Sequence, residues 1–210
     1  MIVNPEIEAY LKQISSYPHP VFKEMEALAE ERNFPIVGPL VGRLLFAMVE
    51  FGHVHTILEC GSGYGYSALW MALALPENGK ITCIEYDANN IELAKSFFEK
   101  AGVFHKVSFE QGDAVEIAAR LTATYDVVMN DIDKERYPTI LPTLLQRLRV
   151  GGMLITDNVL WKGNVIGKAE DDRTRHIQEY NQKLMSDDHL WTTIIPLRDG
   201  VSLSIKLRGK

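Results

Sequence analysis

A regular alternation of short apolar runs and amphipathic segments begins near residue 56, and it constrains the fold more than any other feature. Apolar runs of strand length, such as TILEC at 56–60 and YDVVMND at 125–131, are separated by segments with helical spacing, such as NNIELAKSFFEKAG at 89–102. This alternation predicts an α/β fold with an open, largely parallel sheet. The last two apolar runs flank the turn RDG at 198–200 and predict a closing hairpin that places one strand antiparallel to its neighbours.

The first 35 residues differ from the rest because they carry polar helical patterns. PEIEAYLKQI and PVFKEMEALAEERN place apolar residues at helical spacing, interrupted at YPHP. A chain of 210 residues fits one domain with a small addition. We therefore expect an N-terminal helical appendage at 1–35, which packs on the main domain or on a second subunit, and a single α/β domain at 36–210.

A few local signals predict where helices begin and which side chains are buried. Asn89 or Asn90 is expected to cap the helix that follows them. Pro142 is expected to start or kink the main part of the helix-like segment YPTILPTLLQRLRVGG. Trp70 and Trp191 accompany apolar runs and are expected in the core.

Composition and charge narrow the classes of function. The chain is 46% hydrophobic and 24% charged, which suffices for a packed core, and its net charge is −6. General nucleic-acid and membrane-surface binders usually carry a basic patch, so the acidic balance argues against both, although one basic face remains open. There is no basic stretch followed by an apolar core at the N-terminus, and no apolar run approaches bilayer length. These features predict a soluble cytoplasmic protein.

A glycine-rich stretch, ILECGSGYGYSALW, links the first predicted strand to the next helix. Gly61, Gly63 and Gly65 would permit a tight turn and let a ligand approach the backbone. The spacing is GxGxG, and Tyr66 stands where a dinucleotide-binding fingerprint has its third glycine. The loop alone is therefore weak evidence for any one ligand.

Acidic residues after the neighbouring strands strengthen the prediction of a ligand site. Glu85 ends the next strand, 20 residues after Gly65, where an acid can accept hydrogen bonds from ribose hydroxyls. GDA at 112–114 follows the third strand, and Glu59 lies at the end of the first, where it could face an ammonium group of the ligand. These positions outline a cleft shaped for a nucleoside.

Two further strands end in oxygen-bearing side chains. Asp131 ends YDVVMND, and Asp157 with Asn158 ends MLITDN. Because neighbouring strands lie about 5 Å apart, the three side chains could converge, and two carboxylates that close would repel each other unless a cation joins them. Oxygen ligands favour Mg²⁺, with Mn²⁺ or Ca²⁺ as alternatives. Lys134, about one helical turn after Asp131, could reach the same cavity as a base or a charge partner.

A structural interpretation of these residues stays open from the spacing alone. Asp131 could cap a helix, Asp157 and Asn158 could form a turn, and Lys134 could be a solvated surface residue.

These residues together resemble the metal-dependent, S-adenosylmethionine-dependent O-methyltransferases, a group that includes the catechol and caffeoyl-CoA O-methyltransferases. The resemblance runs from about residue 35 to the C-terminus through ILECGSGYGYSALWMALALP, IEYD, GDA, D-I-D-K-x-x-Y, GGMLITDNVLWKGNV and PLRDGVSLSIK. It implies the class I methyltransferase fold, a Rossmann-like three-layer sandwich with a seven-stranded, mostly parallel sheet and a C-terminal antiparallel hairpin. Asn130 and Cys60 depart from the residues usual in the family, which puts the end of the strand at Asn130 in doubt.

The resemblance also implies roles for the matching positions. Lys134 is the expected general base, Asp131 is expected to act with it in catalysis, and Trp161 is expected near the acceptor. The expected metal ligands are Asp131, Asp157 and Asn158. The residues expected to contact S-adenosylmethionine are Glu59, Gly61, Gly63, Gly65, Ser67, Glu85, Asp113, Ala114 and Asp131.

The function implied is transfer of a methyl group from S-adenosylmethionine to a hydroxyl of a small phenolic, catechol-like acceptor, with a divalent metal such as Mg²⁺. The resemblance further implies a homodimer. Hydroxyl methylation of a modified RNA nucleoside remains an alternative. A nucleotide-cofactor oxidoreductase is a second one, and the GxGxG spacing counts against it. A cofactor-binding protein without chemistry is disfavoured because the whole metal set is present.

Overall fold

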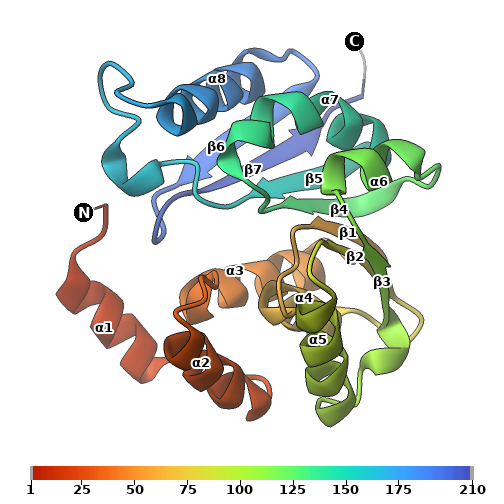
Figure 1. Ribbon diagram of the computed structural model, residues 1–210. Coiled ribbons are helices and arrows are strands. Elements are labelled where there is room, and N and C mark those ends of the chain that lie inside the picture. The colour runs from red at the N-terminus through yellow and green to blue at the C-terminus, as the bar shows by residue number, and fades with distance from the viewer. Residues whose placement is uncertain (1, 209–210) are drawn as a thin grey trace.

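A seven-stranded sheet with helices on both faces forms the centre of the protein in a computed structural model that describes residues 2–208 (Figure 1). The strand order is β3-β2-β1-β4-β5-β7-β6. Strands β1 to β5 pair in parallel, and β7 runs antiparallel to both of its neighbours, so the mostly parallel sheet with a closing hairpin is confirmed. The strands are β1 (Thr56–Cys60), β2 (Lys80–Glu85), β3 (Val107–Gln111), β4 (Tyr125–Asn130), β5 (Leu148–Thr156), β6 (Leu190–Ile195) and β7 (Val201–Lys206).

The helices divide into two layers. Buried side chains of α2, α3, α4 and α5 form one apolar cluster on the sheet, and those of α6, α7 and α8 form a second cluster on its other face (Figure 1). The helices are α1 (Pro5–Ile14), α2 (Val21–Arg32), α3 (Gly38–Phe51), α4 (Tyr66–Ala74), α5 (Ala88–Lys100), α6 (Ala114–Arg120), α7 (Tyr137–Arg147) and α8 (Asp172–Ser186). Short 3₁₀ turns occur at η1 (Phe104–Lys106), η2 (Lys134–Arg136) and η3 (Trp161–Gly163).

The central strands read as continuous apolar runs because both of their faces are covered. In β4, Val127 and Met129 join the cluster under α2 to α5, while Val128 joins the cluster under α6 to α8. Burial on both faces removes the polar alternation of a half-exposed strand. The carboxyl ends of these strands therefore meet at one edge, where the polar loops that follow them lie together.

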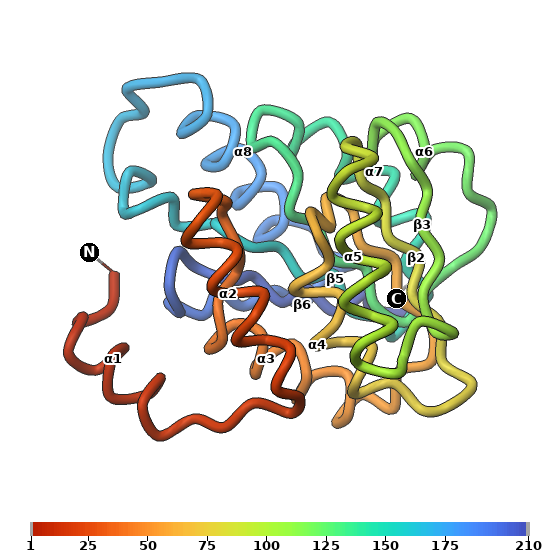
Figure 2. The backbone as a smooth tube through the Cα atoms, turned by 60° about the horizontal axis from the view of Figure 1, so that its bottom comes forward, coloured from red at the N-terminus to blue at the C-terminus, as the bar shows by residue number. Residues whose placement is uncertain are grey.

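The two N-terminal helices differ in burial. Helix α1 has no buried residue and lies at the outer edge of the molecule in both backbone views (Figure 2). Helix α2 buries part of one face in the core, where Phe22 stacks on Trp70 of α4 with ring centroids 4.4 Å apart. Trp70 is 1% exposed, so its expected place in the core is confirmed.

Three local predictions are wrong. Asp87, and neither Asn89 nor Asn90, caps α5, because its carboxylate accepts the backbone N–H of Asn89 at 2.8 Å. Helix α7 begins at Tyr137, so Pro142 does not start it, whereas a kink at Pro142 stays a prediction. The helix ends at Arg147, and β5 begins at Leu148, several residues before MLITDN.

Trp191 is the third error, since it is 69% exposed. It lies on the edge strand β6, whose neighbours Leu190 and Ile194 face the cluster that contains α8. Trp191 points to the opposite face by strand alternation. Between residues 2 and 208, no helix is long and apolar enough to cross a membrane.

Candidate active site

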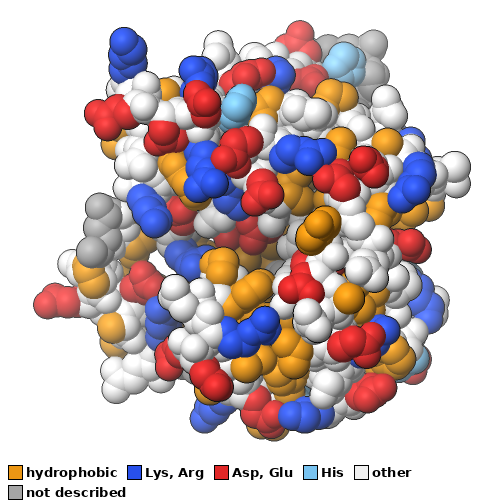
Figure 3. All heavy atoms as spheres, in the orientation of Figure 1, with side chains coloured by type: hydrophobic (Ala, Val, Ile, Leu, Met, Phe, Trp, Pro, Cys, Tyr) orange, Lys and Arg blue, Asp and Glu red, His pale blue; other side chains and the backbone are white. Residues whose placement is uncertain are grey.

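A cavity of about 1170 Å³ opens at the carboxyl ends of the parallel strands. Loops after β1, β2, β3, β4 and β5 all contribute to its lining, and acidic side chains occupy the hollow in the molecular surface (Figure 3). The structure thereby brings together most residues singled out in the sequence. The expected site residues that line the cavity are Gly61, Gly63, Ser67, Glu85, Asp113, Ala114, Asp131, Lys134, Asp157, Asn158 and Trp161. Glu59 and Gly65 lie outside the lining.

The glycine loop is shaped by a close approach to β4. Gly61 has φ +83°, and a Cβ at this position would lie 2.4 Å from the backbone oxygen of Asp131. The backbone N–H of Asp131 donates to Cys60 O at 2.9 Å. Only glycine allows this approach, so the end of β4 is held against the loop after β1.

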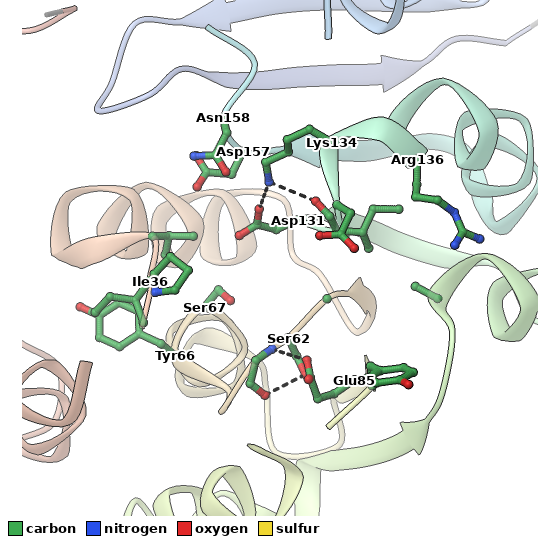
Figure 4. A pocket seen from close by; sticks show the side chains of 18 of the residues that line it. Ile36, Ser62, Tyr66, Ser67, Glu85, Asp131, Lys134, Arg136, Asp157 and Asn158 are labelled. Carbon is green, nitrogen blue, oxygen red and sulfur yellow. Dashed lines mark hydrogen bonds and ion pairs between the residues drawn. The ribbon is translucent and has the colours of Figure 1, made fainter. Parts of the chain in front are cut away.

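Glu85 is fixed by the same loop. Its carboxylate accepts hydrogen bonds from the backbone N–H groups of Gly63 at 2.8 Å and Asp87 at 3.0 Å, and from Asn90 Nδ2 at 3.2 Å. Asp113 caps α6 and forms a bidentate pair with Arg136, with N–O distances of 2.9 and 3.1 Å. Both acids therefore stand in defined orientations in the cavity lining, and Figure 4 shows Glu85 and the partner of Asp113, Arg136.

Glu59 lies beneath the cavity and is completely buried. Its carboxyl accepts a hydrogen bond from Ser67 Oγ, and Cys83 Sγ lies 3.8 Å from its other oxygen. Burial raises the pKa of Glu59 to about 8, against the opposing effect of the Ser67 hydrogen bond. A cationic group bound above Ser67 would favour the ionised form.

The acids at the ends of β4 and β5 converge with Lys134 on one space (Figure 4). Lys134 Nζ donates to Asp131 Oδ1 at 2.7 Å and to Ile132 O at 3.1 Å. Asp157 is 1% exposed, and neither of its carboxylate oxygens has a hydrogen-bond partner. Burial, followed by the charge of Asp131, raises the pKa of Asp157 to about 7. A buried carboxylate without donors is costly unless a cation compensates it.

Asn158 adds an amide to this group. Its φ is +60°, and its Nδ2 lies 3.4 Å from Asp199 Oδ2, so the amide nitrogen donates away from Asp157. The backbone at Asp157 is held by Tyr137, whose hydroxyl donates to Asp157 O at 2.9 Å. The described chain contains no cluster of three His, Cys, Asp or Glu side chains suited to a metal. A metal here would therefore need the amide oxygen as its third protein ligand.

A family model described as O-methyltransferase matches residues 12–207. The chain belongs to the O-methyltransferase family. The expected enzyme class, an S-adenosylmethionine-dependent O-methyltransferase, is thus confirmed at the level of the family, and the oxidoreductase alternative is set aside.

Relatives in this O-methyltransferase family cover nearly the whole chain. Caffeoyl-CoA O-methyltransferase 1 of Arabidopsis thaliana is 28% identical over 97% of this chain and 85% of its own length. Flavonoid 3',5'-methyltransferase of Vitis vinifera is 33% identical over 94% of this chain and 92% of its own. The crystal structure of the O-methyltransferase TomG from Streptomyces achromogenes, in complex with S-adenosylmethionine, has a TM-score of 0.88 at 26% identity and covers 97% of this chain and 96% of that one.

The structure adds cavity residues that the sequence analysis missed. Arg198 and Asp199 line the cavity beside Asp157, in the turn for which the sequence predicts only a closing hairpin. Their position follows from strand direction, because β6 is parallel to β5 and therefore ends at the same edge of the sheet. The segment at 34–37 forms an apolar wall, and no motif marked it.

Proposed function

We propose that this O-methyltransferase transfers a methyl group from S-adenosylmethionine to one of two adjacent hydroxyls on a small phenolic, catechol-like acceptor. We further propose that Asp131, Asp157 and Asn158 hold a divalent cation beside the acceptor. The single observation that carries the proposal is the pair of buried carboxylate oxygens of Asp157, which have no hydrogen-bond partner and lie next to the charge of Asp131. Phenolic compounds in the names of the relatives support the acceptor class.

The side chains present fit a hard cation. Two carboxylates and an amide oxygen are ligands that Mg²⁺ accepts, and Mn²⁺ or Ca²⁺ would suit the same set. When bound, such a cation would lower the pKa of an acceptor hydroxyl and offset the repulsion between Asp131 and Asp157.

Lys134 is the group placed to take the proton of the acceptor hydroxyl. Its Nζ is held by Asp131 and by the carbonyl of Ile132, within the same space as Asp157 and Asn158. The side chain is 13% exposed, so bulk water has little access to it. A base in this position needs to be within hydrogen-bond reach of the hydroxyl it deprotonates.

The other side of the cavity would hold the methyl donor. Glu85 would accept hydrogen bonds from the ribose hydroxyls, and Gly61, Gly63 and Ser67 would lie along the methionine part, above Glu59. Asp113 and Ala114 would lie at the adenine. The donor supplies an electrophilic methyl on a positive sulfur, and opposite charges neutralise during transfer, so these residues would act by positioning and by excluding water.

The cation ligands are tested by Asp157→Ala, with Asp187→Ala as the control. Asp187 lies at the end of α8, outside the cavity lining. We expect Asp157→Ala to lower Mg²⁺-dependent methylation of catechol by about 100-fold or more, because it removes charge stabilisation at the reacting oxygen. Affinity for S-adenosylmethionine, measured by calorimetry, should change little. Full turnover of this variant with the metal chelated would disprove the role.

Lys134→Ala tests the base. The variant should slow methyl transfer by about 10²- to 10⁴-fold, the usual contribution of a positioned base. Binding of S-adenosylmethionine should persist, since Lys134 contacts the acceptor side. A large loss of donor affinity, with single-turnover rates unchanged at saturating donor, would instead show that this lysine is structural.

A further inference from the structure

Cationic side chains around the cavity differ in whether they already have acidic partners. The four that line it are Lys134, Arg136, Lys162 and Arg198. Lys134 donates to Asp131 at 2.7 Å, and Arg136 donates twice to Asp113. Lys134 and Arg136 are therefore hydrogen-bonded to acids of this chain. The side chains of Lys162 and Arg198 make no such hydrogen bond in the described chain, so their donors can bind a ligand.

The guanidinium of Arg198 donates no hydrogen bond within the described chain. None of its five N–H groups makes a hydrogen bond to residues 2–208. Its nearest acid is Asp157, with Nη1 3.7 Å from Oδ2, which is too long for a hydrogen bond. The side chain is 38% exposed, whereas that of Asp157 is 1% exposed. The guanidinium thus stands at the rim, above the buried acid.

The loop that carries Lys162 is joined to the turn that carries Arg198 through Asp199. The backbone N–H of Lys162 donates to Asp199 Oδ1, and Leu160 N donates to Asp199 O at 2.9 Å. The loop after β5 and the β6–β7 turn are therefore tied together. The ammonium of Lys162 has no hydrogen-bond or ion-pair partner in the part of the chain that the structure describes.

Both cations stand on strained backbone. Lys162 has φ +56° and Arg198 has φ +52°, in the left-handed region where a glycine would fit without strain. Non-glycine residues in this region gather at the site, since four of the six in the described chain line the cavity: Asn158, Trp161, Lys162 and Arg198. Strain of this kind persists where the surrounding structure enforces it. Here it places at the cavity two cations that make no side-chain hydrogen bond in the described chain, of which only Arg198 has an acid, Asp157, within 4 Å.

We propose that Arg198 and Lys162 bind an anionic oxygen group, a carboxylate or a phosphate, carried by the methyl acceptor. The acceptor hydroxyls would lie at Asp131 and Asp157, deep in the cavity, and the anionic group would lie at the rim. A planar guanidinium with parallel N–H donors suits either oxyanion. This inference rests on the proposed function, because it assumes that the acceptor occupies this cavity.

The test compares two acceptors that differ in one charge, 3,4-dihydroxybenzoate and 3,4-dihydroxybenzaldehyde. The variants are Arg198→Gln and Lys162→Gln, in which glutamine keeps a polar side chain on the same backbone. Arg175→Gln is the matched control, because Arg175 is an exposed α8 residue paired with Asp172 outside the cavity. The quantity measured is the ratio of kcat/KM for the benzoate to kcat/KM for the aldehyde.

We expect Arg198→Gln to lower this ratio by about 10- to 100-fold, the usual effect of losing a hydrogen bond to a charged group. Lys162→Gln should lower it by about threefold, because its ammonium is exposed. Arg175→Gln should leave it unchanged. An unchanged ratio in Arg198→Gln overturns the inference. If the ratio is unchanged because kcat/KM falls equally for both acceptors, Arg198 acts by balancing the charge of Asp157 and does not bind the acceptor's anionic group.

Inhibition experiments distinguish a carboxylate from a phosphate as the bound group. They also test the role of Arg198 separately from the proposed acceptor class. Benzoate and phenyl phosphate are tested as competitors, and the one whose affinity falls more in Arg198→Gln identifies the group. If neither diol is methylated, the proposed acceptor class fails. The inference is then decided by calorimetry, where binding of these competitors that is weaker in Arg198→Gln than in Arg175→Gln supports it, and equal binding overturns it.

Discussion

At the scale of single residues, burial sets the protonation state of two carboxyl groups at the site, Glu59 and Asp157, and a bound ligand can change that state. Burial raises the pKa of Glu59 to about 8 and that of Asp157 to about 7. Each lies where a positive group is expected, the donor's ammonium for Glu59 and a metal for Asp157. In the unliganded protein burial therefore favours the protonated forms, and a bound cation would favour the ionised ones, which couples stability to pH and to ligand.

Glu59 gives a prediction for the metal-free, donor-free protein. Its pKa is 4.5 in the ordinary state and about 8 when folded, so between these values the folded chain keeps a proton that the unfolded chain has lost. The free energy of unfolding therefore falls as pH rises from about 4.5 to 8 and then levels. Glu59→Gln should remove the part of this slope that comes from Glu59, leaving the part from Asp157, and should stabilise the protein at pH 8 by about 1–3 kcal/mol.

Urea unfolding between pH 5 and 8 measures this effect. Glu30→Gln, an exposed acid on α2, is the control and should follow the parent protein. If the Glu59→Gln and parent curves run parallel over this range, Glu59 is ionised in the folded protein and the prediction is wrong.

At the scale of elements, the contact between the glycine loop and the end of β4 holds Asp131 against the loop after β1. A methyl group at Gly61 would meet the Asp131 backbone, and φ +83° is unfavourable for alanine. Gly102 has a similar φ of +72°, with nothing within 4 Å of the added carbon.

The two glycines therefore form a matched pair. Gly102→Ala should cost about 1–2 kcal/mol of unfolding free energy, from backbone conformation alone. Gly61→Ala should cost at least about 2 kcal/mol more, because a steric clash adds to the conformational cost. If the proposed cation site is right, the variant should also bind Mg²⁺ more weakly, because Asp131 is displaced. Urea unfolding and calorimetry with Mg²⁺ test both points, and equal costs for the two variants would contradict the clash.

The elements also show what sequence reasoning can reach. Strands and helices were predictable where periodicity was strong, and the acids at strand ends were predictable because parallel strands share one edge. The cap of α5 was missed because Asp87, Asn89 and Asn90 are all cap formers, and only the backbone geometry selects among them. The role of the turn at Arg198 depends on the direction of β6, which is a property of pairing and not of local pattern.

Across the whole molecule, the N-terminal segment is linked to the cavity. Glu26 of α2 accepts hydrogen bonds from Tyr17 at 2.8 Å and from Tyr66 at 2.5 Å, and Tyr66 lines the cavity. Helix α2 therefore supports one wall of the site. Helix α1 has no such contact with the core, and the domain boundary near residue 35 remains a prediction.

The exposed stripe on α1 gives a prediction about assembly. Ile7, Tyr10 and Ile14 repeat at helical spacing and are 53%, 58% and 60% exposed. The family resemblance predicts a homodimer, and we expect this stripe at its interface, because these three apolar side chains are exposed to water.

Light scattering after gel filtration should give twice the chain mass of 23.7 kDa for the parent protein. The double variant Ile7→Ser, Ile14→Ser should give the single mass, with the unfolding free energy of the monomer nearly unchanged, since neither side chain is buried. Phe51→Ser, which removes an apolar side chain 85% exposed on α3, is the control and should remain dimeric. A monomeric parent protein would contradict the predicted homodimer. A double variant that remains dimeric would show that the interface does not depend on Ile7 and Ile14.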